Sequence, residues 1–185
     1  MLVRHGQTAW SVSGHHTSYT DLDLTPDGER QAAALAGMLA GRRFAAVFAS
    51  PRLRARRTAE LAGLAVTEVD GDLVEWDYGR YEGLTSSQIR QHRPEWNLWR
   101  DGCPGGESPE QVGQRLDRVL ARAWPHLAAG DVALVGHGHA LRVAGARWVE
   151  LPVAAGGRLR LDTGTLCVLG YEHGVPVLAR WNAGR

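Results

Sequence analysis

The chain begins MLVRHGQTAW (residues 1–10), in which two apolar residues are followed at once by a cation, an imidazole and a glycine. Leu2 and Val3 are typical of a short buried strand. A parallel strand that ended there would bring Arg4 and His5 to the carboxyl edge of a sheet, where ligands of open α/β sheets bind. From these ten residues alone, a strand that stops at the surface with solvated side chains is an equally good interpretation.

The rest of the chain alternates between helix-like and strand-like segments. Thr25 as N-cap, Pro26 at the first helical position and Gly41 at the end predict a helix over 25–41. The other predicted elements are strands at 45–50, 66–69 and 132–135, helices at 51–63, 107–127 and from about residue 139, a mostly irregular stretch at 72–107, and two or three antiparallel strands over 158–182 with turns at Gly164 and Gly174. This alternation predicts an α/β fold in which a mostly parallel sheet carries helices on both faces.

Composition favours one domain over residues 1–185, because 44% hydrophobic content can form a core of that size. No segment has the apolar length of a membrane span, and no signal peptide precedes the first strand, so a cytoplasmic location without membrane contact is expected. Cys103 and Cys167 are too few for a disulfide framework. The net charge of +1 does not support nucleic-acid binding. All 21 basic residues are arginine, which excludes mechanisms that require a lysine.

Similar side chains follow three of the predicted strands. Arg4 and His5 come after the first strand, Arg54 lies in the first turn after the second, and His137 follows the fourth. Two helices begin at the same edge, near Arg54 and His139, and helix N-termini favour anions. Arginine forks and imidazoles together suit a phosphoryl group, so the sequence predicts a phosphate site at this edge.

Four stretches together resemble the histidine phosphatase superfamily, which includes the cofactor-dependent phosphoglycerate mutases. They are RHG (4–6), SPRLRARRTAE (50–60), VEWDYGRYEG (74–83) and VGHGHALR (135–142). Two stretches, WNLWRDGCPGGES (96–108) and GHGHALR (136–142), are similar to the branch of sedoheptulose-1,7-bisphosphatases and bacterial acid phosphatases. The resemblance extends over residues 2–182 and implies a phosphoglycerate mutase-like, three-layer α/β/α sandwich.

The resemblance also implies a set of catalytic residues. His5 is the expected nucleophile, which attacks phosphorus in line and becomes a phosphohistidine without a metal or cofactor. Arg4, Arg54 and His137 would neutralise the phosphoryl oxygens in the transition state. Glu75 would protonate the leaving oxygen and then activate the water that hydrolyses the intermediate.

Two other carboxylates lie close enough to Glu75 to compete for this role. Glu75 occupies the acid position of the family pattern E-x-x-Y-G-x-x-E-G. Glu82 lies at the second acid position of that pattern and is expected to be structural. Asp77 is expected to be a solvated loop carboxylate.

Five further residues are candidate substrate contacts: Ser11, His16, Thr17, Tyr78 and Arg142. Of these, Ser11, His16 and Thr17 match substrate-binding positions of the family. Arg142 lies about one helical turn after His139 and could reach a second phosphate or a sugar hydroxyl, although a helix-surface arginine is an equally good interpretation. Ser18 stands where relatives often have glycine, which argues against close approach of a ligand to the backbone there.

The chain contains single motifs of two other phosphatase classes, but it lacks the other features that each class requires. DLDLT (21–25) has the Asp-x-Asp-x-Thr form of haloacid dehalogenase-type phosphatases, but no buried strand precedes it and the usual lysine is missing. Cys103 could begin a tyrosine-phosphatase loop, but Pro109 stands where that loop needs arginine. Neither the pair His15 and His16 nor the pair His137 and His139 has a third ligand at suitable spacing, so no metal site is expected.

The combined interpretation is a metal-independent phosphatase that acts on small phosphomonoesters such as sugar phosphates and uses no cofactor. A phosphoglycerate mutase-type phosphotransferase is an alternative, disfavoured because the stretch after Glu75 lacks the long mutase insertion. A non-catalytic sensor of phosphorylated ligands is a second alternative, disfavoured because it would not need both a nucleophile and an acid. The expected partner is a small phosphorylated metabolite, and seven tryptophans leave room for an aromatic homodimer interface.

Overall fold

The computed structural model describes residues 1–184, which form a six-stranded sheet of order β3-β2-β4-β1-β5-β6. The strands are β1 (Leu2–Arg4), β2 (Phe44–Ala49), β3 (Glu68–Val69), β4 (Asp131–Gly136), β5 (Leu166–Glu172) and β6 (Val175–Ala183). The pairs β1–β4, β2–β4 and β2–β3 are parallel, and the pairs β1–β5 and β5–β6 are antiparallel. The predicted mostly parallel sheet is therefore confirmed.

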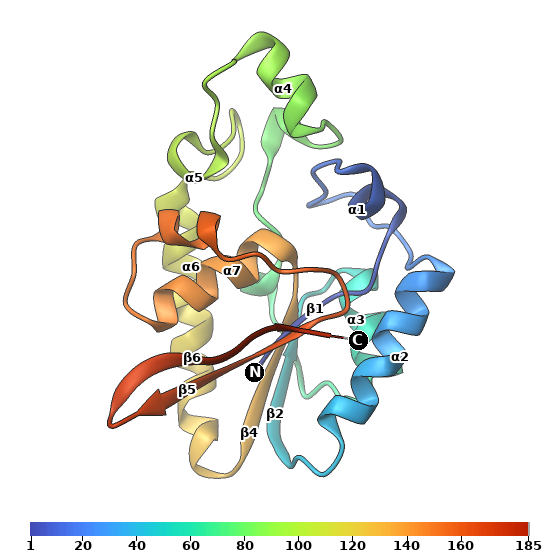
Figure 1. The fold of residues 1–185 in the computed structure, drawn as a ribbon, viewed down its shortest axis with the longest axis vertical. Helices are drawn as coiled ribbons and strands as arrows, with labels where there is room; N and C mark the ends of the chain where they lie inside the picture. The colour runs from blue at the N-terminus through green and yellow to red at the C-terminus, as the bar shows by residue number, and fades with distance from the viewer. Residues whose placement is uncertain (185) are drawn as a thin grey trace.

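Helices cover both faces of the sheet, as the alternation of segments predicts. The helices are α1 (Ala9–Ser13), α2 (Pro26–Leu39), α3 (Leu53–Leu61), α4 (Ser86–His92), α5 (Leu98–Asp101), α6 (Pro109–Ala123) and α7 (Gly138–Trp148). In Figure 1, α2 and α3 lie on one side of the strands and α6 and α7 on the other, while α1, α4 and α5 lie above them. Within residues 1–184, no helix is long and apolar enough to cross a membrane.

Alternating side chains of the central strands pack into two separate cores. Leu2 and Phe48 point to the face covered by α6 and α7, where they join residues such as Leu116. Val3 and Val47 point to the opposite face, where they pack against α2 and α3. Since successive side chains of a strand alternate between faces, both faces of β1, β2 and β4 are buried. Polar side chains carried by these three strands can therefore contact a ligand only at the strand ends.

The region predicted to be mostly irregular, 72–107, contains two helices that the prediction missed. The α4 helix begins with a reciprocal capping box between Thr85 and Gln88, and α5 is capped by Asn97. The predicted helix 107–127 is also too long, because α6 ends at Ala123 and a 3₁₀ turn that contains Pro125 follows. Local capping signals that the prediction did not use account for α4 and α5.

Gly6 and Gly28 allow the first turn of α2 to lie in direct contact with the backbone that follows His5. A Cβ atom on Gly6 would overlap the carbonyl of Gly28, and one on Gly28 would overlap the carbonyl of Gln7. Both neighbours are backbone atoms, which cannot move aside as the end of a flexible side chain can. The missing side chains therefore fix the path of the chain at the end of β1.

We expect Gly28→Ala to lower the free energy of unfolding by about 2 kcal/mol or more, because the added methyl must displace packed backbone. Chemical denaturation at constant m-value would measure the change. Gly37→Ala in the same helix is the matched control, since a Cβ there meets nothing within 4 Å. That control should be neutral or stabilise the protein by up to about 1 kcal/mol. Equal stability of the two variants would contradict this account of the contact.

Candidate active site

The ends of β1 and β4 place the predicted catalytic residues together. The main-chain N–H of His5 donates to the carbonyl of Gly136 at the end of β4, at 3.0 Å. This bond brings the ring of His5 to within 5.2 Å of the ring of His137, measured between centroids. Both histidines are buried. The convergence of strand ends that the sequence predicts is thus present.

A cavity of about 260 Å³ opens beside His5. Of the ten site residues that the sequence predicts, eight line it: Arg4, His5, Ser11, His16, Thr17, Glu75, Tyr78 and Arg142. The other two, Arg54 and His137, are buried and do not belong to its lining. The cavity wall also contains Trp10, His15, Ser86 and His139, which the sequence analysis did not select as site residues.

The ring of His5 is held in one tautomer by its neighbour. Its Nδ1 lies 2.7 Å from the carbonyl oxygen of Gly6. A carbonyl only accepts hydrogen bonds, so Nδ1 carries the proton and the lone pair is left on Nε2. Burial lowers the pKa of His5 well below its ordinary value, and the charges of Arg4 and Arg54 lower it further. At neutral pH the ring is therefore uncharged and nucleophilic.

The guanidinium of Arg4 has one nitrogen that is hydrogen-bonded to the protein and one buried nitrogen that is not. Its Nη1 donates to the carbonyl of Leu161, and the group packs against Gly138. Its Nε is buried and has no hydrogen-bond partner among residues 1–184. Because a buried donor without a partner is costly, this N–H marks a place for an acceptor that comes from outside the protein.

Arg54 and His137 form a hydrogen-bonded pair at the base of the site. Nε of Arg54 donates to Nδ1 of His137 at 3.2 Å, and Nε2 of His137 lies 2.7 Å from the hydroxyl of Ser50. Burial lowers the pKa of His137 well below its ordinary value, and the charge of Arg54 adds to this, so the neutral ring donates from Nε2 to Ser50. The guanidinium of Arg54 also donates to three main-chain carbonyls, those of Thr17, Ser18 and Thr20.

Glu75 is fixed by three main-chain donors, two of them at the start of α7. Its Oε1 accepts from the N–H groups of Trp76 at 2.9 Å and Ala140 at 2.8 Å, and its Oε2 accepts from the N–H of His139 at 3.0 Å. The first turn of a helix has unpaired N–H groups and a partial positive charge, which suit a carboxylate. Glu75 is thereby held in the cavity wall.

The two competing carboxylates have other partners. Glu82 accepts hydrogen bonds from the main-chain N–H groups of Ser18 and Thr20, which fixes the loop beside the cavity. Asp77 accepts from the N–H of Gly79 and from the hydroxyl of Tyr19. Neither Glu82 nor Asp77 lines the cavity, so among the three only Glu75 faces it.

Several predicted substrate contacts are already engaged with the protein. The hydroxyl of Ser11 donates to the carbonyl of Thr8 within the capping box of α1. The ring of His16 packs on Tyr78 with 4.5 Å between centroids. Arg142 donates to two carbonyls, those of Gly156 and Gly157, and its guanidinium lies 4.6 Å from the ring centre of Trp99. Arg142 is therefore an anchored group of the cavity wall and not a solvated helix-surface arginine.

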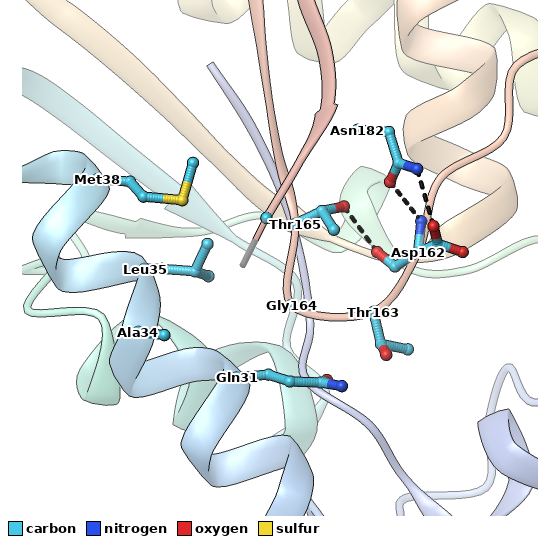
Figure 2. Close-up of a pocket in the computed structure, with 10 residues that line it drawn as sticks. Gln31, Ala34, Leu35, Met38, Asp162, Thr163, Gly164, Thr165 and Asn182 are labelled. Carbon is cyan, nitrogen blue, oxygen red and sulfur yellow. Dashed lines mark hydrogen bonds between the residues drawn. The ribbon is translucent and has the colours of Figure 1, made fainter.

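The segment 161–165 connects the site with a separate pocket. The N–H of Gly164 donates to the carbonyl of His5, and the N–H of Arg4 donates to the carbonyl of Thr165. The same segment and α2 enclose a pocket of about 310 Å³, in which Asn182 holds Asp162 with two hydrogen bonds (Figure 2). None of the ten predicted site residues lines this second pocket.

Comparison with known proteins identifies the family. The sequence profile of the histidine phosphatase superfamily (branch 1) matches residues 1–184. The chain belongs to this superfamily. Acid phosphatase of Mycobacterium tuberculosis is 50% identical over 182 residues, which cover 97% of the chain and 89% of that protein. Sedoheptulose 1,7-bisphosphatase of Saccharomyces cerevisiae is 40% identical in an alignment of 184 positions that covers 83% of the chain and 68% of that protein.

Solved structures of histidine phosphatases have the same fold. The product of an open reading frame of Mycobacterium tuberculosis has a TM-score of 0.94 at 48% identity, over 99% of the chain and 96% of that structure. Alpha-ribazole phosphatase of Shigella flexneri has a TM-score of 0.84 at 27% identity, over 98% and 95%. The expected superfamily and its sandwich fold are confirmed, and the phosphatases among its relatives support a hydrolase.

Proposed function

We propose that this histidine phosphatase hydrolyses small phosphomonoesters without a metal, through a phosphohistidine on His5. The observation that carries the proposal is the pairing of a neutral His5, whose lone pair is on Nε2, with an unpartnered buried N–H on Arg4. A nucleophile beside a waiting cationic donor suits a phosphoryl group, which has an electrophilic centre and anionic oxygens.

The first step would transfer the phosphoryl group to the enzyme. The lone pair on Nε2 of His5 attacks phosphorus, and the bond from phosphorus to the leaving oxygen breaks with its electron pair on that oxygen. Glu75, acting as general acid, would donate a proton to the leaving oxygen. Arg4 would stabilise the charge on the phosphoryl oxygens directly, and Arg54 and His137, which lie behind the cavity wall, would do so by exchanging their bonds to each other and to Ser50 for bonds to the bound group.

The second step would release phosphate. The carboxylate of Glu75 accepts a proton from a water molecule, the water oxygen attacks phosphorus, and the bond to Nε2 of His5 breaks with its electron pair on nitrogen. Inorganic phosphate leaves, and both His5 and Glu75 return to their starting protonation states. The cycle uses only side chains that lie in or behind the cavity.

The proposed substrates are sugar phosphates and related hydroxylated metabolites. The cavity wall contains hydroxyl and imidazole groups, including those of Ser86, His16 and His139, which can form hydrogen bonds to a polyol. Relatives of the chain include a sedoheptulose bisphosphatase, and a similar solved structure is a glucosyl-3-phosphoglycerate phosphatase. Phosphate release from a panel of phosphorylated metabolites would rank the candidates.

Phosphoglycerate mutase activity is the second candidate. A 2,3-bisphosphoglycerate-dependent phosphoglycerate mutase of Sinorhizobium fredii is 35% identical over 77% of the chain and 75% of that protein. A mutase passes the phosphoryl group from His5 to a second hydroxyl instead of to water. Interconversion of 2- and 3-phosphoglycerate without phosphate release would favour the mutase, and phosphate release alone would favour the phosphatase.

Brief mixing with ³²P-labelled glucose 6-phosphate, followed by an alkaline quench, is expected to leave label on His5. Phosphohistidine is stable to base and labile to acid, so treatment with acid should release the label as phosphate. Peptide mass spectrometry would locate it. Tight binding of a phosphorylated ligand, with no label on His5 and no turnover, would contradict the proposed enzyme activity and favour a sensor of phosphorylated ligands with the same fold.

A further inference from the structure

One residue, His139, makes hydrogen bonds to both Glu75 and Tyr78 in the cavity wall. The main-chain N–H of His139 donates to Oε2 of Glu75, and Nδ1 of the same residue lies 2.6 Å from the hydroxyl of Tyr78. Glu75 and Tyr78 belong to one irregular segment, three residues apart. His139 therefore contacts this segment twice, once through its backbone and once through its ring.

The hydrogen bond between the two side chains has a defined direction. Burial raises the pKa of Tyr78 well above its ordinary value, and the charge of Glu75 raises it further. Burial, together with the charge of Arg142, lowers the pKa of His139 well below its ordinary value. At neutral pH the hydroxyl keeps its proton and the imidazole is uncharged. The hydroxyl of Tyr78 therefore donates to Nδ1 of His139.

The ring of His139 has little freedom to turn away from Tyr78. Trp99 on α5 packs edge to face against it, with 5.4 Å between centroids, and His16 lies 6.0 Å away on the same basis. The guanidinium of Arg142 covers Trp99. This packing holds the acceptor nitrogen in place for the hydroxyl, so the bond is a fixed part of the cavity wall.

The main-chain N–H of His139 donates to Oε2, the carboxylate oxygen of Glu75 that can still accept another hydrogen bond. Oε1 already accepts two hydrogen bonds, from Trp76 and Ala140, whereas Oε2 accepts one, from His139. A carboxylate oxygen can accept two, so Oε2 is the oxygen suited to exchange a proton with a substrate. The position of residue 139 thus determines where that oxygen lies.

We propose that the hydrogen bond from Tyr78 to His139 is a positioning device for Glu75. It fixes the first turn of α7 against the segment 75–78 and thereby aims Oε2 at the leaving oxygen. His139 acts through Glu75 and is a positioning residue. The inference rests on the proposed role of Glu75 as acid and base. Proton transfer depends steeply on geometry, so a small displacement of Oε2 would slow it.

The test compares two substrates that differ in their need for an acid. Glycerol 2-phosphate releases an alkoxide-like oxygen, which needs a proton, and p-nitrophenyl phosphate releases a stable phenolate, which does not. The measured quantity is the ratio of kcat/KM for the first substrate to that for the second. Because kcat/KM reports the step up to the first irreversible event, it reports transfer to His5.

His139→Phe keeps an aromatic ring and removes the acceptor, while Tyr78→Phe removes only the donor. Each is expected to lower the ratio about 3- to 10-fold, the effect of one hydrogen bond. The double variant should lower it no further than either single variant, since both remove the same bond. His139→Asn, whose Oδ1 can accept near the position of Nδ1, should restore most of the ratio.

Equal losses for both substrates, or additive losses in the double variant, would overturn the proposal and leave the pair with a role in packing alone. Thermal unfolding of each variant shows whether it folds. If His139→Phe does not fold, the substrate ratio of Tyr78→Phe alone tests the proposal. Glu75→Gln is the reference. A normal ratio in Glu75→Gln would overturn the proposed function itself, whereas a lowered ratio there with normal ratios in the other variants would overturn only this inference.

Discussion

Replacement of His5 by Ala is expected to reduce phosphatase turnover at least about a thousandfold with every substrate. The proposed reaction forms and breaks a bond to Nε2 of His5 in each cycle, and no other nucleophile lies at the position that its ring occupies. His137 is the nearest ring, but both of its nitrogens are engaged by Arg54 and Ser50. Steady-state phosphate release would measure the loss.

His5→Asn is the matched control for a loss of structure. The side-chain amide can still donate to the carbonyl of Gly6, as Nδ1 of the native ring does, but it cannot accept a phosphoryl group. We expect it to fold as the native protein does and to be as inactive as His5→Ala. Native turnover should persist in a chelator. Strong inhibition by a chelator alone, or substantial activity in His5→Asn, would contradict the metal-free phosphohistidine reaction.

Glu75→Gln is expected to reduce turnover of sugar phosphates by about 10²- to 10⁴-fold, because an alkoxide-like leaving oxygen needs a proton. The loss should be much smaller for p-nitrophenyl phosphate, whose phenolate leaves unaided. Hydrolysis of the phosphohistidine would still need the base, so kcat for this substrate can fall even where phosphoryl transfer does not. Comparison of the two substrates separates these steps.

Asp77→Asn and Glu82→Gln are the controls for the assignment of the acid. Asp77 accepts hydrogen bonds from Gly79 and Tyr19, and Glu82 fixes the loop at residues 18–20, so their loss should alter stability or binding. Neither should change the preference between the two substrate types. A change in that preference in Asp77→Asn, with none in Glu75→Gln, would show that Asp77 is the acid.

The sequence predicts the sheet and half of the residues that line the cavity, for a physical reason. Buried strands are short apolar runs, and the polar residues that follow them must lie at an edge, so Arg4 and His5 could be placed once the other strand ends showed the same pattern. Helix caps such as Thr25 are equally local signals. The family pattern added Glu75, whose position at the start of α7 depends on contacts far apart in the chain.

What the sequence did not predict depends on tertiary contacts. From the sequence, Ser50 is only the last residue of a predicted strand and the first of a family motif, and its bond to His137 exists because β2 and β4 are neighbours. His139 was considered as a helix start and as half of a metal pair, whereas its contact with Tyr78 requires α7 to pack beside an irregular segment. A polar residue at the end of an apolar strand is the signal that could have indicated Ser50.

The position of β1 in the sheet has a consequence for the order in which the protein can fold. The first strand made is paired on one side with β4 and on the other with β5, at Leu2 opposite Leu134 and Cys167. At synthesis rates of about 5–20 residues per second, the two partners emerge roughly 6 to 32 s after His5 does. Such distant pairing slows folding. His5 is thus made well before the two strands that flank β1, so a nascent chain that lacks β4 and β5 could not assemble the proposed site.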